Sequence, residues 1–579
     1  MKSIFLKINR SKFWLALLLL ALTLPSRLIN IARAVNIDEP WWVISSSNFY
    51  YAVTHRDFKD TYFEYHPGVT NMWVISTAMH VYFPEYRGFG QGFFDQRKPF
   101  FEEFLRENGK ETLELVRASR YIQAGVLAVL ALTAFFLLSL LVGEKTAFLS
   151  IALATISPFF LGHSRLLNME AMGALFVLVS LLGLHVYLTH DRKLIYLLLS
   201  GVGFGLAQLN KSTSIALLGV VGVMLLIGLF RRDEKTFASK FRDAVRVFVI
   251  WFGAAAVTYF VLWPGMWVDP GRMLGEVYGN AFSYAFQGAR LDVTEELVPA
   301  QFSVSTRLDG VLLYLRYWAS GTTFITWLGM AFAGLFLFSK NKERMSAQVK
   351  SLIGYLALLG VLFILIFGIV QGRNHAHYIM NTFVAFDVIA GIGWGTALLS
   401  VASRWKGMSS AYASLTVMAA LVLVQIGIGL PYAPYYFTYK NPLASHAATY
   451  GYGEGMAEAS DYLSAKPNAD QLSAYVYNGM GTFSYFFPGE TVVLKRIYLI
   501  TNDFSTITTE LRASDYLVLY PVTRSWQPET EKILGVLEDT LEPEKVIYIN
   551  GLEYIRIYNV AEIPESVYER LQAMDEPQD

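Results

Sequence analysis

Two adjacent carboxylates, Asp38 and Glu39, follow the first strongly apolar stretch of this chain, in the sequence NIDEPWW at Asn36–Trp42. Ionised side chains are costly near hydrocarbon and are retained there mostly where they serve a function. Close like charges also make one acid a better proton acceptor, as a general base must be. The pair therefore predicts acid–base chemistry. The alternative is that both acids only begin a helix, where they complement its dipole.

Further ionisable residues stand where other apolar stretches begin or end. They are Arg117, Arg120, Arg165, Glu170, Lys211, Arg373, His375 and His377, and Asn210 precedes Lys211. Groups of both signs on rigid helix ends are a common construction of binding and catalytic sites. Whether they meet depends on the elements that carry them and on the side of the membrane that each faces.

These carrying elements are predicted to be membrane-spanning helices. Of the 579 residues, 54% are hydrophobic and 16% are charged, whereas soluble domains carry about 25% charged residues. Many apolar runs reach the roughly 18 residues that cross a bilayer, so we expect an α-helical polytopic membrane protein. Eleven spans are predicted, at 13–30, 121–141, 146–161, 170–189, 194–209, 213–230, 245–263, 311–338, 351–370, 376–400 and 411–430.

Charge and cysteine content exclude other classes. The chain has 47 basic and 47 acidic residues, and this balance argues against a nucleic-acid partner. The absence of cysteine excludes disulfides and thiolate metal sites. The first span has a second interpretation, because its basic start, short apolar stretch and the sequence ARA at Ala32–Ala34 also fit a cleaved signal peptide.

Charge asymmetry predicts the orientation of the spans. With a cytoplasmic N-terminus, six segments face the cytoplasm and carry 19 Lys and Arg residues, whereas three short loops opposite carry one each, Arg165, Lys211 and Arg373. Because basic loops stay in the cytoplasm, we expect this topology in the plasma membrane. The odd number of spans then places the C-terminal domain on the extracytoplasmic side, and the ionisable residues above share that face.

Two long external loops, 31–120 and 264–310, add structure to this face. The sequence from Pro99 to Arg120 is typical of amphipathic helices that lie along a membrane surface. The tryptophans of WPGMWVDP, at Trp263–Pro270, are expected to anchor the second loop in the interface.

The chain beyond Pro431 has a different composition and is predicted to form a small external α/β domain, 432–579, after a transmembrane catalytic domain, 1–431. Helices are expected in GEGMAEASDYLSAK and PETEKILGVLEDTLE, and strands in QLSAYVY and DYLVLYP. KVIYINGLEYIRIYNV is predicted to form two strands joined at Asn550–Gly551, because Asn-Gly is a strong hairpin signal.

Each ionisable residue also has an interpretation without chemistry. Arg120 and Arg165 could anchor helices to lipid phosphates. Lys211, in the tight NKST turn, could be structural, although it has little freedom to reach the interface. His375 and His377 form a lone His-x-His pair, which is more often not a metal site.

The motifs together resemble the GT-C superfamily of polyprenyl-phosphate-sugar-dependent glycosyltransferases, and within it the protein O-mannosyltransferase and aminoarabinose transferase branch. The motifs are, in order, DEPWW at Asp38–Trp42, YHPGVTNMW at Tyr65–Trp73, SPFFLGHSRLLNMEAM at Ser157–Met172, GLAQLNKSTSIALL at Gly205–Leu218 and NPLASHAATYGYGEGMAEASDYL at Asn441–Leu463. The chain departs from the family pattern in having Glu170 where Asp is usual, and RNHAHY is only loosely similar to the family's Arg-Tyr stretch.

The resemblance implies a lipid-linked donor, a polyprenyl or dolichyl monophosphate sugar, and inverting transfer to an acceptor. Asp38 would be the base and Glu39 its support. Four residues would stabilise the leaving phosphate: Arg120, Arg165, Lys211 and Arg373. Four others would position substrate or a metal: His66, Glu170, His375 and His377. A divalent cation bridging Glu170 or a histidine to the phosphate is one option, and no cofactor is otherwise expected.

Other functions remain as alternatives. A lipid or polysaccharide could replace protein as the acceptor of the same chemistry. A transporter or flippase would need charges deep in the bilayer and repeat symmetry, and we identify neither in the sequence. A non-catalytic scaffold that binds through its external domain would leave the shared face of charges unexplained.

Overall fold

The computed structural model describes residues 10–86, 92–95, 98, 100–231, 236–287, 304–339, 345–369, 375–402, 408–444, 449 and 451–575. The chain divides into two compact units. The helical unit comprises Met1–Ile29, Ser46–Gly92 and Ser119–Ala447, and the sheet unit comprises Asn30–Ser45, Phe93–Ala118 and Ala448–Asp579. The last and longest segment of the sheet unit begins at Ala448, whereas the sequence predicts a boundary at 432. The unit also includes two earlier segments, one of which carries Asp38 and Glu39.

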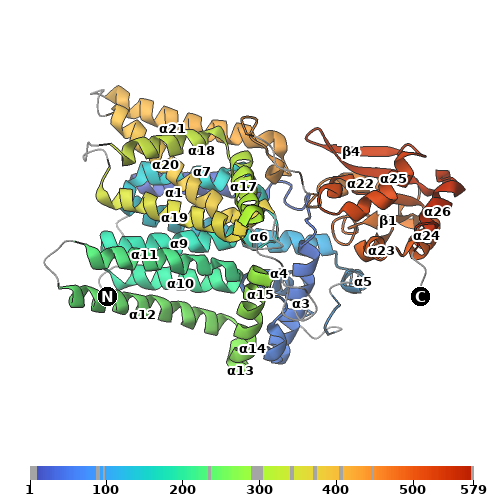
Figure 1. The fold of residues 1–579 in the computed structure, drawn as a ribbon, viewed down its shortest axis with the longest axis horizontal. Coiled ribbons are helices and arrows are strands. Elements are labelled where there is room, and N and C mark those ends of the chain that lie inside the picture. The colour runs from blue at the N-terminus through green and yellow to red at the C-terminus, as the bar shows by residue number, and fades with distance from the viewer. Residues whose placement is uncertain are drawn as a thin grey trace. The chain divides into compact units, whose positions relative to one another are not determined.

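The helices before Ala448 include many long apolar ones. They are α1 (Arg10–Thr23), α2 (Pro25–Leu28), α3 (Glu39–His55), η1 (Phe58–Thr61), α4 (Val69–Tyr82), α5 (Phe100–Glu107), α6 (Thr112–Val142), α7 (Glu144–Ile156), α8 (Pro158–His163), α9 (Glu170–Thr189), α10 (Leu194–Asn210), η2 (Ser212–Ile215), α11 (Ala216–Phe230), α12 (Phe237–Leu262), α13 (Gly265–Val268), α14 (Pro270–Leu274), η3 (Gly275–Gly279), α15 (Asn280–Gln287), α17 (Val304–Gly321), α18 (Phe324–Leu337), α19 (Ala347–Ile369), η4 (Ala376–Ile379), α20 (Met380–Ala402), α21 (Met408–Gly429), η5 (Leu430–Tyr432) and η6 (Tyr436–Thr438). Figure 1 shows α9, α10, α11 and α12 side by side.

Eight helical segments of the described chain are long and apolar enough to cross a bilayer. They are Arg10–Leu28, Thr112–Val142, Glu170–Thr189, Ser212–Phe230, Phe237–Leu262, Ala347–Ile369, Ala376–Val401 and Tyr412–Tyr432. The protein is therefore an integral membrane protein of mostly helical structure, as the sequence predicts. Three of the eleven expected spans do not meet this criterion as continuous long helices. The one at 194–209 is the continuous 17-residue helix α10.

The span expected at 146–161 is broken at Ser157. Helix α7 ends at Ile156, and α8 begins at Pro158. Ser157 has an extended backbone, with ψ of 128°, because the ring of a following proline disfavours the helical conformation of the residue before it.

The span expected at 311–338 is not one straight helix. Helices α17 and α18 are bent by 109° at the break between them. The carbonyl groups that end α17 accept hydrogen bonds from Asn441, whose backbone N–H donates to Ser320 O and whose side-chain amide donates to Thr322 O. Because orphan carbonyls at a helix end need such donors, Asn441 stabilises the break.

The helix cluster also holds a carboxylate that sequence analysis missed. Asp387, in α20, is fully buried, and the hydroxyl of Thr326 in α18 donates to it at 2.6 Å. Asp387 lies within the span expected at 376–400, where no charge deep in the bilayer was identified from the sequence. Its hydrogen-bond donor belongs to a neighbouring helix, as is usual for polar groups inside a membrane.

Close packing of α20 depends on small residues. A Cβ atom at Gly391 would overlap Ser150 of α7, and one at Gly393 would overlap the carbonyl oxygen of Gly329 in α18. Such small residues let helix backbones approach closely in membranes, where packing rather than the hydrophobic effect drives association.

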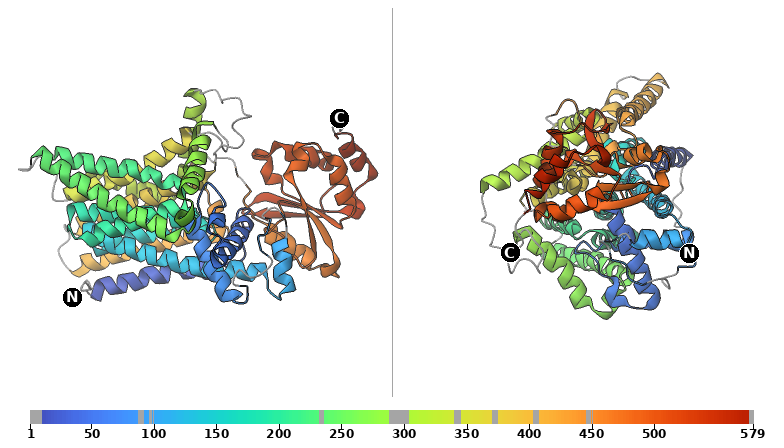
Figure 2. Two further views of the ribbon diagram at one scale, coloured as in Figure 1. Left: turned by 90° about the horizontal axis from the view of Figure 1, so that it is seen from below. Right: turned by 90° about the vertical axis from the view of Figure 1, so that its right-hand side faces the viewer.

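The sheet unit contains one five-stranded sheet, seen from two further directions in Figure 2. Its strands, β1 (Ser473–Tyr477), β2 (Glu490–Leu494), β3 (Tyr516–Leu519), β4 (Lys545–Ile549) and β5 (Leu552–Asn559), lie in the order β2-β1-β3-β5-β4. β1 pairs in parallel with β2 and β3, and β5 runs antiparallel to β3 and β4. The remaining elements are α22 (Met456–Ser464), η7 (Ala469–Gln471), α23 (Arg496–Ile500), α24 (Phe504–Arg512), η8 (Pro521–Ser525), η9 (Pro528–Thr530), α25 (Glu531–Glu538), η10 (Val560–Glu562) and α26 (Glu565–Gln572).

Every element predicted in this region is present. The hairpin of β4 and β5 turns at Asn550 and Gly551, which both have positive φ, 51° and 80°, as a type I′ turn requires. The prediction missed β2, α23, α24 and α26. The surface helices expected at Pro99–Arg120 are only partly correct. Helix α5 is separate, but the residues from Thr112 onward form the first turns of the 31-residue α6.

We expect Gly393→Ala to destabilise the helical unit, because the new methyl group would overlap a backbone oxygen. Overpacking of this kind costs about 1–3 kcal/mol, so the Tm of the detergent-solubilised protein should fall. Gly427→Ala in α21 is the matched control, since nothing lies within 4 Å of that position and alanine is the better helix former. Equal Tm values for the two variants would contradict the close approach of α20 and α18.

Candidate active site

The acidic pair belongs to the sheet unit, and its two members differ in environment. Glu39 is fully buried. Its carboxylate accepts the backbone N–H of Asn36 at 2.8 Å, and the Asn36 side-chain oxygen accepts the N–H groups of Asp38 and Glu39 at 2.7 and 2.9 Å. This reciprocal pattern is a capping box. Glu39 therefore starts α3 as a buried cap, and not as a solvated acid.

Asp38 is only half-buried, and its carboxylate faces a turn far along the chain. The Tyr452 hydroxyl donates to Asp38 Oδ2 at 2.5 Å. A second carboxylate, that of Glu454, accepts the backbone N–H of Tyr452 at 2.5 Å and the hydroxyl of Tyr520 at 2.8 Å. Burial, and then the charge of Glu454, hold the pKa of Tyr520 well above its usual value, so it remains a donor at neutral pH.

A third acid of the same unit, Glu102 in α5, is also buried. It accepts the hydroxyl of Ser484 at 3.1 Å. Burial raises its pKa to about 7, although Ser484 and Arg106 act in the opposite direction. Burial raises the pKa of Tyr485, and the negative charges of Glu102 and Glu39 raise it further.

In the helical unit, Lys211 and Glu170 form a buried ion pair. Lys211 Nζ lies 2.7 Å from Glu170 Oε1, and both side chains are 8% exposed. Glu170 is the first residue of α9, where the helix dipole also favours a negative charge. The ammonium further lies 4.7 Å from the centre of the Tyr378 ring, a cation–π distance.

His66 lies beside this pair. Its Nδ1 is 3.0 Å from the hydroxyl of Ser212, the residue after Lys211. The Thr70 hydroxyl donates to the side chain of Asn210 at 2.7 Å, and the Gly68 N–H donates to the Asn210 carbonyl. The His-Pro-Gly segment and the Asn-Lys-Ser turn, 140 residues apart, are thus bonded together.

Histidines contribute to the same region. His163, which sequence analysis did not select, interacts electrostatically with Glu170 and Lys211. Its ring centre lies 5.5 Å from that of His377, and His375 stacks on His377 at the same separation. Within the described part of the chain, however, no three His, Asp or Glu side chains are grouped as a metal site would need.

The arginines are placed differently. The Arg165 guanidinium donates to the backbone carbonyls of Ser26, Arg27 and Ile29 at 2.7, 3.1 and 2.7 Å, so it caps the end of α2. Arg120 is buried and interacts electrostatically with Arg165. Arg373 lies outside the described residues.

The structure therefore assembles two groups, one in each unit. In the sheet unit, Asp38 and Glu39 lie with Tyr452, Glu454 and Tyr520. The last three residues were not selected as site residues from the sequence. His66, Glu170 and Lys211 lie together, with His163 and Tyr378 as unexpected neighbours. The capping box was legible in the spacing of Asn36 and Glu39. The YGYGEG sequence was noted, but nothing local indicates that its tyrosine contacts Asp38.

The motifs at Ser157–Met172 and Gly205–Leu218, which supply Glu170 and Lys211, lie in a segment that matches a known family. Residues 115–263 match the family described as dolichyl-phosphate-mannose-protein mannosyltransferase. This match confirms the resemblance to GT-C glycosyltransferases that the sequence predicts, and it indicates a glycosyltransferase. No curated protein matches the chain in sequence.

The chain is also similar to solved structures, three of which differ in sequence identity, coverage and TM-score. ArnT from Cupriavidus metallidurans bound to undecaprenyl phosphate is 12% identical, with 98% of this chain and 100% of that chain covered and a TM-score of 0.48. The Archaeoglobus fulgidus oligosaccharyltransferase in its apo form is 12% identical, with 92% and 73% covered and a TM-score of 0.47. The S. cerevisiae protein O-mannosyltransferase Pmt1–Pmt2 complex bound to the sugar donor is 17% identical, with 50% and 38% covered and a TM-score of 0.35.

We expect acidification to stabilise the protein through Glu102. The folded pKa of this residue is raised from 4.5 to about 7, so in that window the folded chain holds a proton that the unfolded chain has released. Stability therefore falls as pH rises through the window, by at most about 3 kcal/mol. Glu102→Gln cannot ionise, and its Tm should rise relative to wild type between about pH 5 and about pH 8. A constant difference in Tm would contradict the proposed titration.

The buried ion pair predicts a rescue experiment. Lys211→Met leaves the Glu170 carboxylate buried without its partner, which typically costs about 3–5 kcal/mol. Adding Glu170→Gln removes the unpaired charge and should restore most of the lost Tm. If the double variant is as unstable as Lys211→Met, or if the single variant is fully stable, the pair does not contribute as its geometry suggests.

Proposed function

We propose that this protein transfers a sugar from a polyprenyl (dolichyl) phosphate carrier to an acceptor on the extracytoplasmic face of the plasma membrane, with inversion at the anomeric carbon. The observation that carries the proposal is the family match over residues 115–263. The integral membrane character supports it, since a lipid-linked donor must be reached from the bilayer.

Asp38 is the better base of the acidic pair. Glu39 is fully buried, and its carboxylate is engaged in the capping box. Asp38 is half-buried, and its carboxylate accepts the hydroxyl of Tyr452. In the transfer step, the acceptor oxygen forms a bond to the anomeric carbon while its proton passes to Asp38. The bond between the anomeric carbon and the phosphate oxygen breaks, and its electron pair stays on the leaving phosphate.

Lys211 is the best candidate to bind the donor phosphate. An ammonium has three N–H donors, and the bond to Glu170 uses one of them. A phosphate there would gain charge-assisted hydrogen bonds as its charge grows, and His66 and His377 are further candidates to position it. Arg120 would add charge, whereas the guanidinium of Arg165 is already bonded to backbone carbonyls. The role proposed for Arg373 rests on the family resemblance.

The orientation and the acceptor complete the proposal. The charge asymmetry of the loops favours a cytoplasmic N-terminus and an extracytoplasmic C-terminal domain. The description of the matching family favours a protein hydroxyl as acceptor, and a lipid or glycan hydroxyl would require the same base. A divalent cation is not needed for this mechanism, because Lys211 already supplies positive charge.

The decisive experiment combines a donor assay with Asp38→Asn. Membranes containing the protein are incubated with radiolabelled polyprenyl-phosphate sugars, and label is measured in protein, lipid and glycan fractions. General-base catalysis contributes about 10²–10⁴-fold, so Asp38→Asn should lower turnover by that factor at unchanged protein level.

Asp539→Asn, an exposed acid of the same unit, is the control and should remain active. Absence of transfer by the wild-type protein to any fraction would overturn the proposed function. Near-normal turnover of Asp38→Asn would remove Asp38 as the base but leave the transferase assignment intact.

A further inference from the structure

A glycine-rich turn of the sheet unit packs directly against the segment that carries Asp38. Gly453 and Gly455 have positive φ, 105° and 84°, which other residues rarely adopt. A Cβ atom at Gly453 would overlap the Val35 carbonyl oxygen, and one at Gly451 would overlap the ring of Tyr520. The glycines thus allow the turn to lie between Tyr520 and the backbone just before the acidic pair.

Polar side chains of the turn form a continuous chain of hydrogen bonds that ends at Asp38. The hydroxyl of Tyr520 donates to Glu454 at 2.8 Å and accepts the N–H of Gly453 at 3.1 Å. Glu454, which is 2% exposed, accepts the N–H of Tyr452. Tyr452 in turn donates its hydroxyl to Asp38. The buried carboxylate therefore fixes the backbone of the residue that bonds the half-buried one.

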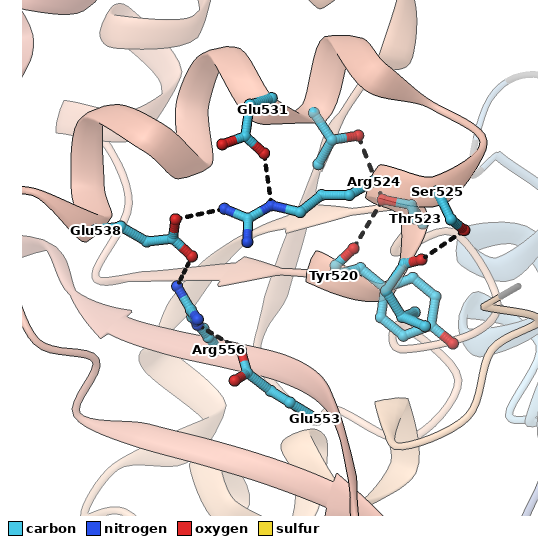
Figure 3. A network of polar contacts seen from close by, with 10 residues as sticks. Tyr520, Thr523, Arg524, Ser525, Glu531, Glu538, Glu553 and Arg556 are labelled. Atoms are coloured by element: carbon cyan, nitrogen blue, oxygen red, sulfur yellow. Dashed lines mark hydrogen bonds and ion pairs between the residues drawn. The ribbon is translucent and has the colours of Figure 1, made fainter. Parts of the chain in front are cut away.

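Tyr520 is itself held firmly at the end of β3. The hydroxyl of Thr523, in η8, donates to the Tyr520 carbonyl at 2.7 Å. The next residue, Arg524, begins a chain of ion pairs with Glu531 and Glu538 of α25 that continues to Arg556 and Glu553 of β5, as Figure 3 shows. Such a network restrains η8, and with it the position from which Tyr520 donates.

The topology of the sheet places the acidic segment near the carboxyl ends of β1 and β3. From β1 the chain continues to β2 on one side and later to β3 on the other. In open α/β sheets, functional groups collect at the carboxyl ends of strands where the order reverses in this way. Tyr520 follows β3, and Gly481, which follows β1, is so close to Pro40 that a Cβ atom there would overlap the proline ring.

We propose that Tyr452 is a positioning residue for Asp38, and that Glu454 and Tyr520 hold the turn at residues 451–455 from which Tyr452 donates. This inference rests on the proposed function in taking Asp38 as the base. The hydroxyl of Tyr452 orients the carboxylate and stabilises its ionised form. Among the described residues, the acids and tyrosines on the segments around Asp38 include Glu39, Glu102, Tyr452, Glu454, Tyr485 and Tyr520.

The experiment measures the pH dependence of kcat/KM for Tyr452→Phe in the full-length protein in membranes. Loss of a hydrogen bond to the carboxylate makes Asp38 easier to protonate, so the acidic limb of the profile should move upward by about one pH unit or more. Transfer at neutral pH should fall by about tenfold. Tyr520→Phe removes a bond that lies two hydrogen bonds further from Asp38, so it should move the limb in the same direction by a smaller amount. It serves as the test if Tyr452→Phe does not accumulate.

The matched control is Tyr462→Phe, which removes another tyrosine–carboxylate bond of the same unit, the one to Glu544 at 2.6 Å. Its profile should coincide with that of wild type. An unmoved acidic limb in both Tyr452→Phe and Tyr520→Phe, or an equal movement in the control, would overturn the inference and leave the turn as packing. Those results together with an inactive Asp38→Asn would spare the proposed base, whereas an active Asp38→Asn would defeat the base itself.

Discussion

The requirement that a buried charge be bonded governs the placement of nearly every residue discussed here. An ionised group withdrawn from water loses many kcal/mol of solvation, and the protein must replace that solvation with partners. Lys211 and Glu170 do so by pairing with each other. Arg165 instead donates to three backbone carbonyls, and Glu454 accepts an N–H and a tyrosine hydroxyl.

The same requirement divides the acidic pair into two roles. Glu39 is enclosed, and it is tolerated because the capping box supplies its donor and because it begins a helix. Asp38, one residue earlier, keeps part of its surface exposed and is bonded through a tyrosine hydroxyl. Adjacent residues at a helix start point in different directions, so two neighbouring acids can differ in burial and in hydrogen-bond partners.

Hydrogen bonding also distinguishes the candidate roles of the cationic residues. From sequence, Arg165 and Lys211 were equivalent candidates for the donor phosphate. In the structure Arg165 fixes the end of α2, whereas Lys211 keeps donors beyond its bond to Glu170 and lies among His66, His163 and Tyr378. The proposal of a phosphate site therefore now depends mainly on Lys211. It is also a site made from loops 140 residues apart, each held by the neighbouring helix end.

The sequence by itself determined the class of the protein, several of the regular elements of its C-terminal region and its resemblance to a family of glycosyltransferases. Long apolar runs predict membrane helices, and the Asn-Gly pair predicts a type I′ hairpin. The order of the motifs indicates the family resemblance. Each of these signals is local or additive along the chain. The sequence also contained the signs of the break at Ser157 and of the cap at Glu39, since Pro158 and the Asn36–Glu39 spacing are local.

Only the tertiary structure decided which distant groups meet. The bond from Tyr452 to Asp38 joins residues 414 positions apart, and the bend between α17 and α18 is held by Asn441, far along the chain. No periodicity or spacing encodes such contacts, because they follow from how whole elements pack and not from any one of them. The motifs of the chain therefore predict its chemistry, whereas the fold decides which residues bond each buried acid and cation.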